Sequence, residues 1–228
     1  MSAGTPVYLV TGASGNLGRS TMTALARRGA RLAGADRRGA PGDVGEALWL
    51  GGADFFAPAA CEGMVAAVIA RYGRLDGVAH TVGGFATAAA ADAGPDVWEE
   101  MFRLNLLTTL NVFRAALPPL REAGAGGLVA VGAGAALRAP AAFGPYAASK
   151  AAVLRLVEAF AAEVKADGVR VNAVLPGTMD TPQNRAAMPD ADPSRWVRPE
   201  EVAEAIAFLL DPAASGVTGA ALSAPGRT

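Results

Sequence analysis

Short apolar runs alternate with longer helical patterns along the whole of this 228-residue chain. The expected strands are Val7–Val10, Arg31–Asp36, Ala47–Leu50, Asp76–Val82, Gly127–Val131, Val169–Leu175 and Gly219–Ser223. The expected helices are Asn16–Arg28, Cys61–Tyr72, one that begins near Val97 with Asp96 as its cap, Asn105–Glu122, Tyr146–Ala166 and Pro199–Leu210. Repeated strand–helix–strand units predict a parallel sheet covered by helices on both faces, and right-handed crossovers restrict it to a doubly wound α/β fold of three layers.

Composition limits what such a chain can do. No linker or composition break divides residues 1–228, so a single domain is expected, and 52% apolar residues supply a large core. The net charge of −1 gives no support for a nucleic-acid partner, and no segment approaches the roughly 20 unbroken apolar residues of a membrane helix. The single Cys61 excludes an internal disulfide, and the first ten residues do not resemble a signal peptide, so a cytoplasmic protein is expected. No cluster of His, Cys and carboxylate residues suggests a metal site.

A glycine-rich turn, Thr11-Gly-Ala-Ser-Gly-Asn-Leu-Gly18, joins the first strand to the first helix. Glycine at 12 allows a tight turn, glycine at 15 lets the backbone approach a pyrophosphate, and glycine at 18 lets the helix pack on the strand. The helix N-terminus adds unpaired N–H groups and a positive potential. Such glycine triplets are common, but this position favours a dinucleotide site formed by Gly12, Ser14, Gly15, Asn16, Leu17 and Gly18.

Asp36 ends the second strand, where a carboxylate can bind both hydroxyls of a ribose and repel a 2′-phosphate. This favours NAD as the cofactor. Arg37 and Arg38 follow directly, and their guanidinium groups either clamp the 2′-phosphate of NADP or belong to a solvated loop.

Tyr146 and Lys150 are four residues apart and so share one face of a helix. A free phenol has a pKa of about 10, which is too high for proton transfer near neutrality. A neighbouring ammonium and a positive nicotinamide ring would lower this pKa, so that the phenol could donate or accept a proton. The alternative is that both side chains simply decorate the helix.

Together with the phosphate loop, the segment Tyr146-Ala-Ala-Ser-Lys150 resembles the short-chain dehydrogenase/reductase family, and the resemblance covers essentially the whole chain. It implies a Rossmann fold and a nicotinamide-dependent oxidoreductase that acts on a small molecule. It also implies residue roles: Lys150 binds the nicotinamide ribose, and Asn105 orders a proton-relay water. The resemblance also places Asp54 at the adenine of the cofactor. Two further segments would contact the cofactor: His80-Thr-Val-Gly-Gly84 through Val82 and Gly83, and Pro176-Gly-Thr-Met-Asp-Thr181 through Pro176, Gly177 and Thr181. Thr181 would lie at the nicotinamide carboxamide.

Two positions depart from the family pattern. Asn16 replaces the middle glycine of the phosphate loop TGxxxGxG. Ala133 stands where the family has its catalytic serine, thirteen residues before the tyrosine, and no Ser or Thr occurs from Leu128 to Pro145. Loss of one such donor can cost about 10²–10³ in rate.

The stretch from Val174 to Trp196 resembles dihydropteridine reductases, a branch that also lacks the serine. The turn Gly83-Gly84-Phe85 and the segment Gly226-Arg227-Thr228 agree with this branch. The branch implies a quinonoid dihydropterin substrate, whose charge spreads over a conjugated ring.

The long irregular stretch Gly177–Arg198 is expected to act as a lid. Phe85, Met188 and Trp196 could line a flat pocket for an aromatic ring, or could anchor loops.

Two alternatives remain open at this stage. One is a carbonyl reductase or alcohol dehydrogenase in which Thr178 or a water replaces the serine; the other is a catalytically weak NAD(H)-binding protein that senses redox state. The family resemblance also implies a homodimer, or a tetramer, through the two long helices around Asn105–Leu120 and Tyr146–Ala166, although these helices could merely cover the sheet.

The lone His80 is expected to serve packing or hydrogen bonding in a buried strand.

Overall fold

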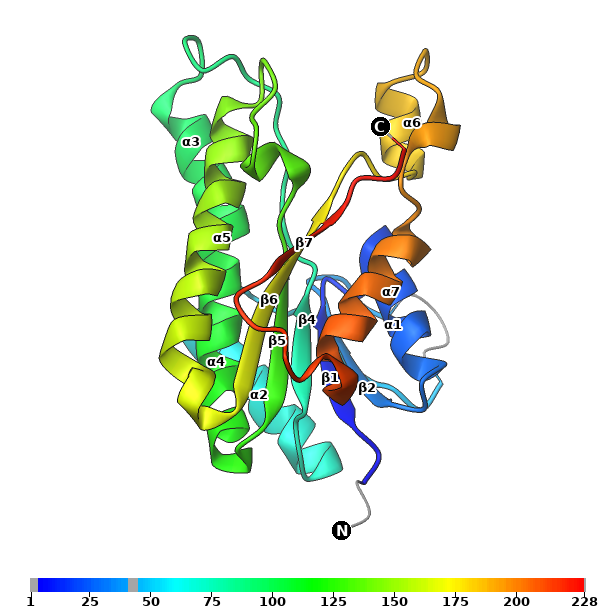
Figure 1. Cartoon of the computed structure of the whole chain (residues 1–228), viewed down its shortest axis with the longest axis vertical. Helices are drawn as coiled ribbons and strands as arrows, with labels where there is room; N and C mark the ends of the chain where they lie inside the picture. The colour runs from blue at the N-terminus through cyan, green and yellow to red at the C-terminus, as the bar shows by residue number, and fades with distance from the viewer. Residues whose placement is uncertain (1–3, 41–44, 228) are drawn as a thin grey trace.

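The computed structural model describes residues 4–40 and 45–227. Seven strands form one parallel sheet in the order β3-β2-β1-β4-β5-β6-β7 (Figure 1). Their bounds are β1 Val7–Thr11, β2 Arg31–Ala35, β3 Leu48–Leu50, β4 Gly77–His80, β5 Gly126–Val131, β6 Val169–Pro176 and β7 Ala221–Ala224. The order reverses between β1 and β4, so the doubly wound sheet expected from the sequence is confirmed.

Helices cover both faces of this sheet (Figure 1). Their bounds are α1 Asn16–Ala26, α2 Pro58–Tyr72, α3 Pro95–Phe102, α4 Thr108–Ala123, α5 Gly144–Val164, α6 Pro182–Ala187 and α7 Pro199–Leu210. Helices α2, α4 and α5 bury one apolar cluster against the sheet, and α1 and α7 bury a second cluster on the opposite face. The two clusters hold the strands rigidly, and the loops at the strand ends are therefore presented by a fixed frame.

Three local predictions were wrong in detail. Helix α3 begins at Pro95 with Gly94 as its N-cap, so Asp96 lies in the first turn instead of capping the helix. Asn105 lies in a π-helical turn, Arg103–Leu107, that precedes α4. The stretch Gly177–Arg198 contains α6 and a 3₁₀ turn, Pro193–Arg195. Thr228 of the segment Gly226–Thr228 lies outside the described residues.

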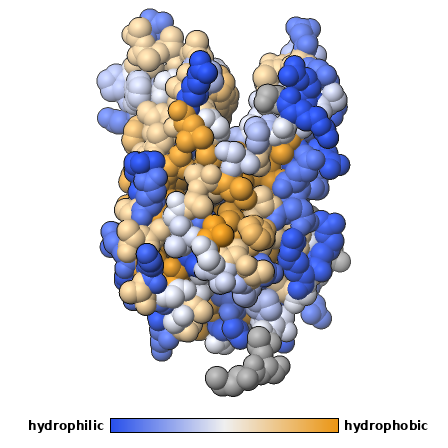
Figure 2. Space-filling model, in the orientation of Figure 1, coloured by the Kyte–Doolittle hydropathy of each residue, from blue (hydrophilic) through white to orange (hydrophobic). Residues whose placement is uncertain are grey.

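The end of the molecule near the carboxyl termini of the strands is hollowed by a cleft between two projections (Figure 2). One projection carries α3 and the loop before α5, and the other carries α6 (Figure 1). The wall on the α3 side is largely apolar, whereas the wall on the α6 side is hydrophilic (Figure 2). Phe85 and Leu137 are among the most exposed large apolar side chains, at 55% and 65%.

Among the described helices, none has the length and apolar character needed to span a membrane.

Candidate active site

The predicted site residues gather at the carboxyl edge of the sheet, around the point where the strand order reverses. The glycine-rich turn follows β1, Asp36 follows β2, and the Thr81–Gly84 segment follows β4. Since β1 and β4 are hydrogen-bonded neighbours, with Thr11 paired to His80, the loops that follow them lie next to each other. This is the position where doubly wound folds bind their ligands.

The turn after β1 can form only with glycine at two places. Gly12 has φ +72°, and a Cβ there would lie 2.9 Å from Thr81 Oγ1. A Cβ on Gly18 would overlap the carbonyl of Gly12, so α1 could not pack so closely on the turn. Helix α1 then begins with no side-chain cap, which leaves its first N–H groups directed at the loop.

One buried polar atom in this turn also fits an anionic ligand. The Ser14 hydroxyl is buried and has no hydrogen-bond partner among the described residues. A donor without a partner beside the uncapped end of α1 matches a pyrophosphate, which carries only acceptor oxygens. The chain therefore fits the dinucleotide that its glycine pattern predicts.

The Asp36 carboxylate is fixed between the glycine-rich turn and the loop after β2. Its Oδ2 accepts the Ser14 N–H at 3.1 Å, and its Oδ1 accepts the Arg38 N–H at 3.1 Å, with Arg38 Nε 3.6 Å away. Burial acts to raise the pKa of Asp36, but the bonds from Arg38 and Ser14 outweigh burial and lower the pKa. Arg37 and Asp54 are exposed, and the Asp54 carboxylate accepts the Phe56 N–H at 2.9 Å.

Tyr146 and Lys150 lie in the first two turns of α5, and burial perturbs both. The Lys150 ammonium donates to the carbonyl of Val131 at 2.8 Å, and burial lowers its pKa to about 8. Burial raises the pKa of Tyr146 to about 12. Among the protein's own groups, desolvation of the tyrosine therefore outweighs any effect of an ammonium directed toward Val131. The expected lowering of the phenol pKa, which includes a positive nicotinamide ring, stays a prediction.

Asn105 clamps the turn that follows β4. Its Oδ1 accepts the Gly84 N–H at 2.9 Å, while its Nδ2 donates to the Gly84 carbonyl at 3.1 Å and to Ser149 Oγ at 2.9 Å. The Ser149 hydroxyl in turn donates to the carbonyl of Tyr146 at 2.7 Å. Sequence reasoning missed Ser149, although its position directly before Lys150 on the same helix was a signal.

Glycine at 83 brings the lysine and the asparagine together. A Cβ on Gly83 would lie 2.7 Å from Asn105 Oδ1 and 3.1 Å from Lys150 Nζ. Any larger residue at this position would push one of the two polar groups away. Val82 precedes this close approach and packs against the core formed with α4 and α5.

An aromatic group surrounds the ring of Tyr146. Phe85 meets it edge-on with ring centroids 4.8 Å apart, and Phe85 meets Phe143 at 5.1 Å. Phe143 follows Ala142, whose φ of +62° turns its carbonyl toward the Ala88 N–H at 2.7 Å. Sequence reasoning predicted Phe85 but missed Phe143, because only the fold brings their loops together.

Of the other two predicted pocket residues, Trp196 is buried and therefore anchors the loop. Met188 is 38% exposed.

The position of the missing serine is apolar in the structure as well. Ala133 is buried and extended directly before the turn Gly134–Ala136, which packs on α5. No hydroxyl takes its place in the segment from Leu128 to Pro145, all of which the structure describes.

The Pro-Gly segment lies at the end of β6, beside β7. Pro176 is the last residue of β6, and Gly177 packs so closely on Pro225 that a Cβ there would overlap the Pro225 carbonyl. Thr181 is buried, and its hydroxyl oxygen caps α6 by accepting the Asn184 N–H at 3.2 Å. A hydroxyl that accepts one hydrogen bond can still donate another.

His80 has the packing role expected of it. It is buried, with Nδ1 2.7 Å from Thr11 Oγ1 and Nε2 3.2 Å from Thr108 Oγ1. Burial lowers its pKa to about 3, so the ring is neutral. Within residues 4–40 and 45–227, no group of three or more His, Cys, Asp or Glu side chains could hold a metal ion.

The sequence and fold match known proteins over almost their full length. Residues 12–226 match the family model described as enoyl-(acyl carrier protein) reductase. A relative from Sinomonas cyclohexanicum, cis-4-hydroxycyclohexanecarboxylate dehydrogenase, is 36% identical, with 96% of this chain and 95% of the relative covered. The chain belongs to the short-chain dehydrogenase/reductase family. Members of this family are oxidoreductases that generally use NAD or NADP.

Two further relatives of this short-chain dehydrogenase/reductase are informative. The inactive 2-(S)-hydroxypropyl-CoM dehydrogenase 2 of Xanthobacter autotrophicus is 33% identical, with 89% of this chain and 96% of the relative covered. A short-chain type dehydrogenase/reductase from Mycobacterium ulcerans superimposes with a TM-score of 0.89 at 28% identity, with 97% and 89% of the two chains covered.

Proposed function

We propose that the chain is a single-domain, NAD(H)-dependent reductase in which Tyr146 is the proton donor, Lys150 and Asn105 assist it, and the acceptor is a flat conjugated C=N or C=O system of the quinonoid dihydropterin type. The observation that carries the proposal is the apolar, aromatic surrounding of Tyr146 beside Ala133. Phe85 is 55% exposed and packs edge-on against Tyr146 and Phe143, so it offers an apolar surface on which a planar ring can lie beside Tyr146. A ring that spreads its developing charge needs no hydroxyl at position 133.

The chain's own groups suit proton donation. With its pKa raised to about 12 by burial, the phenol keeps its proton at neutral pH. We propose that a positive nicotinamide ring beside it would lower this pKa, so that Tyr146 could give its proton to the reduced product. Lys150, with its pKa near 8, is close to the point where it can pass on a proton. Asn105 holds Gly84 and Ser149 in place around this pair, and we propose that it also orders a relay water.

The cofactor would be held by the loops described above. The uncapped end of α1 and the Ser14 hydroxyl would bind its pyrophosphate, Asp36 and Asp54 its adenosine, and Thr181 its carboxamide. When bound, the reduced nicotinamide supplies the hydride. We favour NAD because the Asp36 carboxylate is ionised and would repel a 2′-phosphate, while Arg38, 3.6 Å from it, leaves NADP usable.

Substitution of the missing serine tests the substrate class. Ala133→Ser should raise the reduction of simple ketones by about 10²–10³ and change the reduction of quinonoid dihydropterin little. The measurement is NADH and NADPH absorbance across a substrate panel, with Tyr146→Phe as the inactive control. Efficient ketone reduction by the unaltered enzyme, with no turnover of the dihydropterin, would contradict the proposal.

A second candidate is an alcohol dehydrogenase or carbonyl reductase for an alicyclic substrate. It is favoured by the 36% identity to a relative named for a hydroxycyclohexanecarboxylate. The same panel, read in the oxidative direction with NAD and cyclic alcohols, distinguishes the two candidates. Tight NADH binding without turnover of any substrate would instead support a redox-sensing binding protein; one relative of the chain is itself named as inactive.

A further inference from the structure

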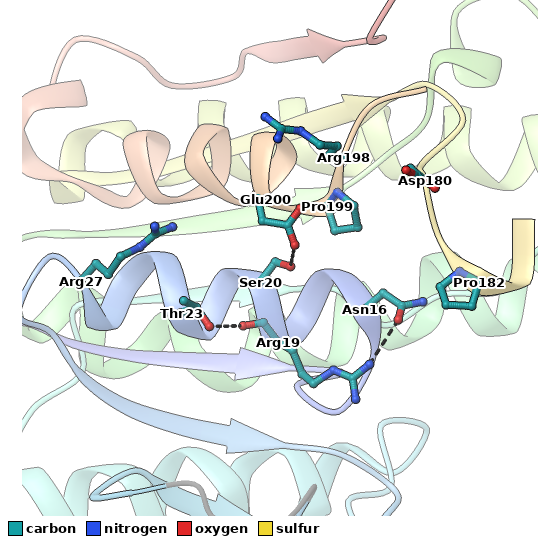
Figure 3. A pocket seen from close by; sticks show the side chains of 10 residues that line it. All are labelled: Asn16, Arg19, Ser20, Thr23, Arg27, Asp180, Pro182, Arg198, Pro199 and Glu200. Carbon is teal, nitrogen blue, oxygen red and sulfur yellow. Dashed lines mark hydrogen bonds between the residues drawn. The ribbon is translucent and has the colours of Figure 1, made fainter. Parts of the chain in front are cut away.

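A side-chain hydrogen bond ties the start of α1 to α6. Asn16 Nδ2 donates to Gln183 Oε1 at 2.7 Å, and Asn16 Oδ1 accepts from Arg19 Nη2 at 3.2 Å. Because the Arg19 guanidinium can only donate, it fixes the Asn16 amide with its NH₂ group toward Gln183. Figure 3 shows the Asn16 side chain directed toward Pro182, beside a cavity of about 440 Å³ between α1 and α7.

The other hydrogen bonds of the α6 segment stay within the same loop. Asn184 bonds to Thr181 and to Met179, and Arg185 forms an ion pair with Asp180. Among the described residues, Gln183 makes the one hydrogen bond that joins residues 182–188 to a residue outside Gly177–Arg198. This exposed contact is therefore the side-chain hydrogen bond that joins α6 directly to the start of α1.

The same residue that holds α6 begins the helix end at which the pyrophosphate would bind. Asn16 is the first residue of α1, and its backbone N–H is one of the groups left without a side-chain cap. Asn16 occupies the place where the family pattern has a glycine, and a glycine could not reach Gln183. We propose that the Asn16–Gln183 hydrogen bond is a latch that keeps α6 closed over the glycine-rich turn, so that the dinucleotide enters and leaves only while the latch is open. The coupling to the dinucleotide rests on the proposed function; the latch itself does not.

Four variants test the latch: Asn16→Ala, Gln183→Ala, the double variant, and Ser20→Ala as the matched control. Ser20 Oγ donates to Glu200 Oε1 at 3.0 Å, which is an equally exposed bond from α1, but it leads to α7 instead of α6. Hydrogen exchange of residues 182–188 in the protein without added nucleotide should be about threefold to tenfold faster in both single variants. The double variant should match the single ones, and Ser20→Ala should match the unaltered protein.

Stopped-flow fluorescence of NADH then tests the coupling. Loss of the latch should raise the association and dissociation rate constants by a similar factor of about threefold to tenfold and leave Kd nearly unchanged. A faster dissociation with unchanged association and a higher Kd would instead make Asn16 a direct nucleotide ligand and would overturn the latch.

Unchanged exchange at 182–188, or additive effects in the double variant, would also overturn the latch. Exchange that changes as expected in a protein that binds neither NADH nor NADPH would refute the proposed function, and with it the coupling, while leaving the contact itself established.

Discussion

At the scale of single residues, burial determines the chemistry of the site more than charge pairing does. The pKa of Tyr146 rises and that of Lys150 falls, since both charged forms lose solvation in the first turns of α5. The sequence placed both groups on one helical face, but it could not show how deeply that face is buried or that Val131 takes up the ammonium.

The lowered pKa of Lys150 predicts a pH dependence. Lys150 loses its proton as pH rises through about 8, so kcat/KM for reduction should be constant below pH 7 and fall at higher pH. The profile is to be recorded from pH 6 to 10 with the best acceptor of the substrate panel. Tyr146→Phe should lower the rate by about 10²–10⁴ while still binding NADH. A rate that stays flat up to pH 10 would count against a role for the lysine in the reaction.

His80 predicts a change in stability with pH. Its native pKa of about 3 lies below the ordinary value of 6.5, so the unfolded chain binds a proton that the native state does not. The stability that neutral His80 contributes is therefore complete above pH 6.5 and is lost as pH falls from 6.5 toward 3. At pH 5 the loss is about 2 kcal/mol.

Urea denaturation at pH 7 and pH 5 measures this effect. In His80→Asn, the difference in unfolding free energy between the two pH values should be about 2 kcal/mol smaller than in the unaltered protein. Carboxyl groups titrate in both proteins, so their contribution to the pH dependence of the unfolding free energy cancels when the two proteins are compared. An equal difference in the two proteins would show that the native state accepts a proton on His80.

At the scale of elements, most of the fold could be predicted from periodic patterns. Apolar runs indicated all seven strands, and the predicted helix Pro199–Leu210 agrees with α7. Short pieces were missed, because α6 with six residues and the π-turn before α4 are too brief to show a period. Likewise, the meeting of Phe143 with Phe85 depends on how two loops cross, which no local pattern records.

The turn after β1 gives a prediction with an internal control. Gly18→Ala should destabilise the protein by about 1–3 kcal/mol and abolish NADH binding, because the new methyl group overlaps the Gly12 carbonyl. Gly15→Ala should have a much smaller effect on stability, since its Cβ would lie 3.2 Å from the same oxygen. Urea denaturation and NADH fluorescence report the two effects. Normal NADH binding by Gly18→Ala would disprove the assigned geometry of the turn.

At the scale of the whole molecule, the nucleotide should act as part of the fold. Loops from both halves of the sheet, after β1 and β2 on one side and after β4 and β6 on the other, would contact the same ligand. NADH at one hundred times its Kd should therefore raise the free energy of unfolding by about 2.7 kcal/mol. Denaturation with and without NADH measures this gain, and Gly18→Ala is the control that should show none. No gain in the unaltered protein at saturating NADH and NADPH would exclude a nucleotide-binding role.

The two projections that flank the cleft differ in polarity, with more apolar surface on the α3 side and more hydrophilic surface on the α6 side (Figure 2). An acceptor with one apolar end and one polar end would bind there in one orientation, since the reversed orientation would bury its polar atoms against Phe85, which packs on Tyr146. Only one face of a prochiral centre in the acceptor would then meet the coenzyme. Handedness of the product would thus be set by the contrast between the two projections, even though neither of them carries out the chemistry.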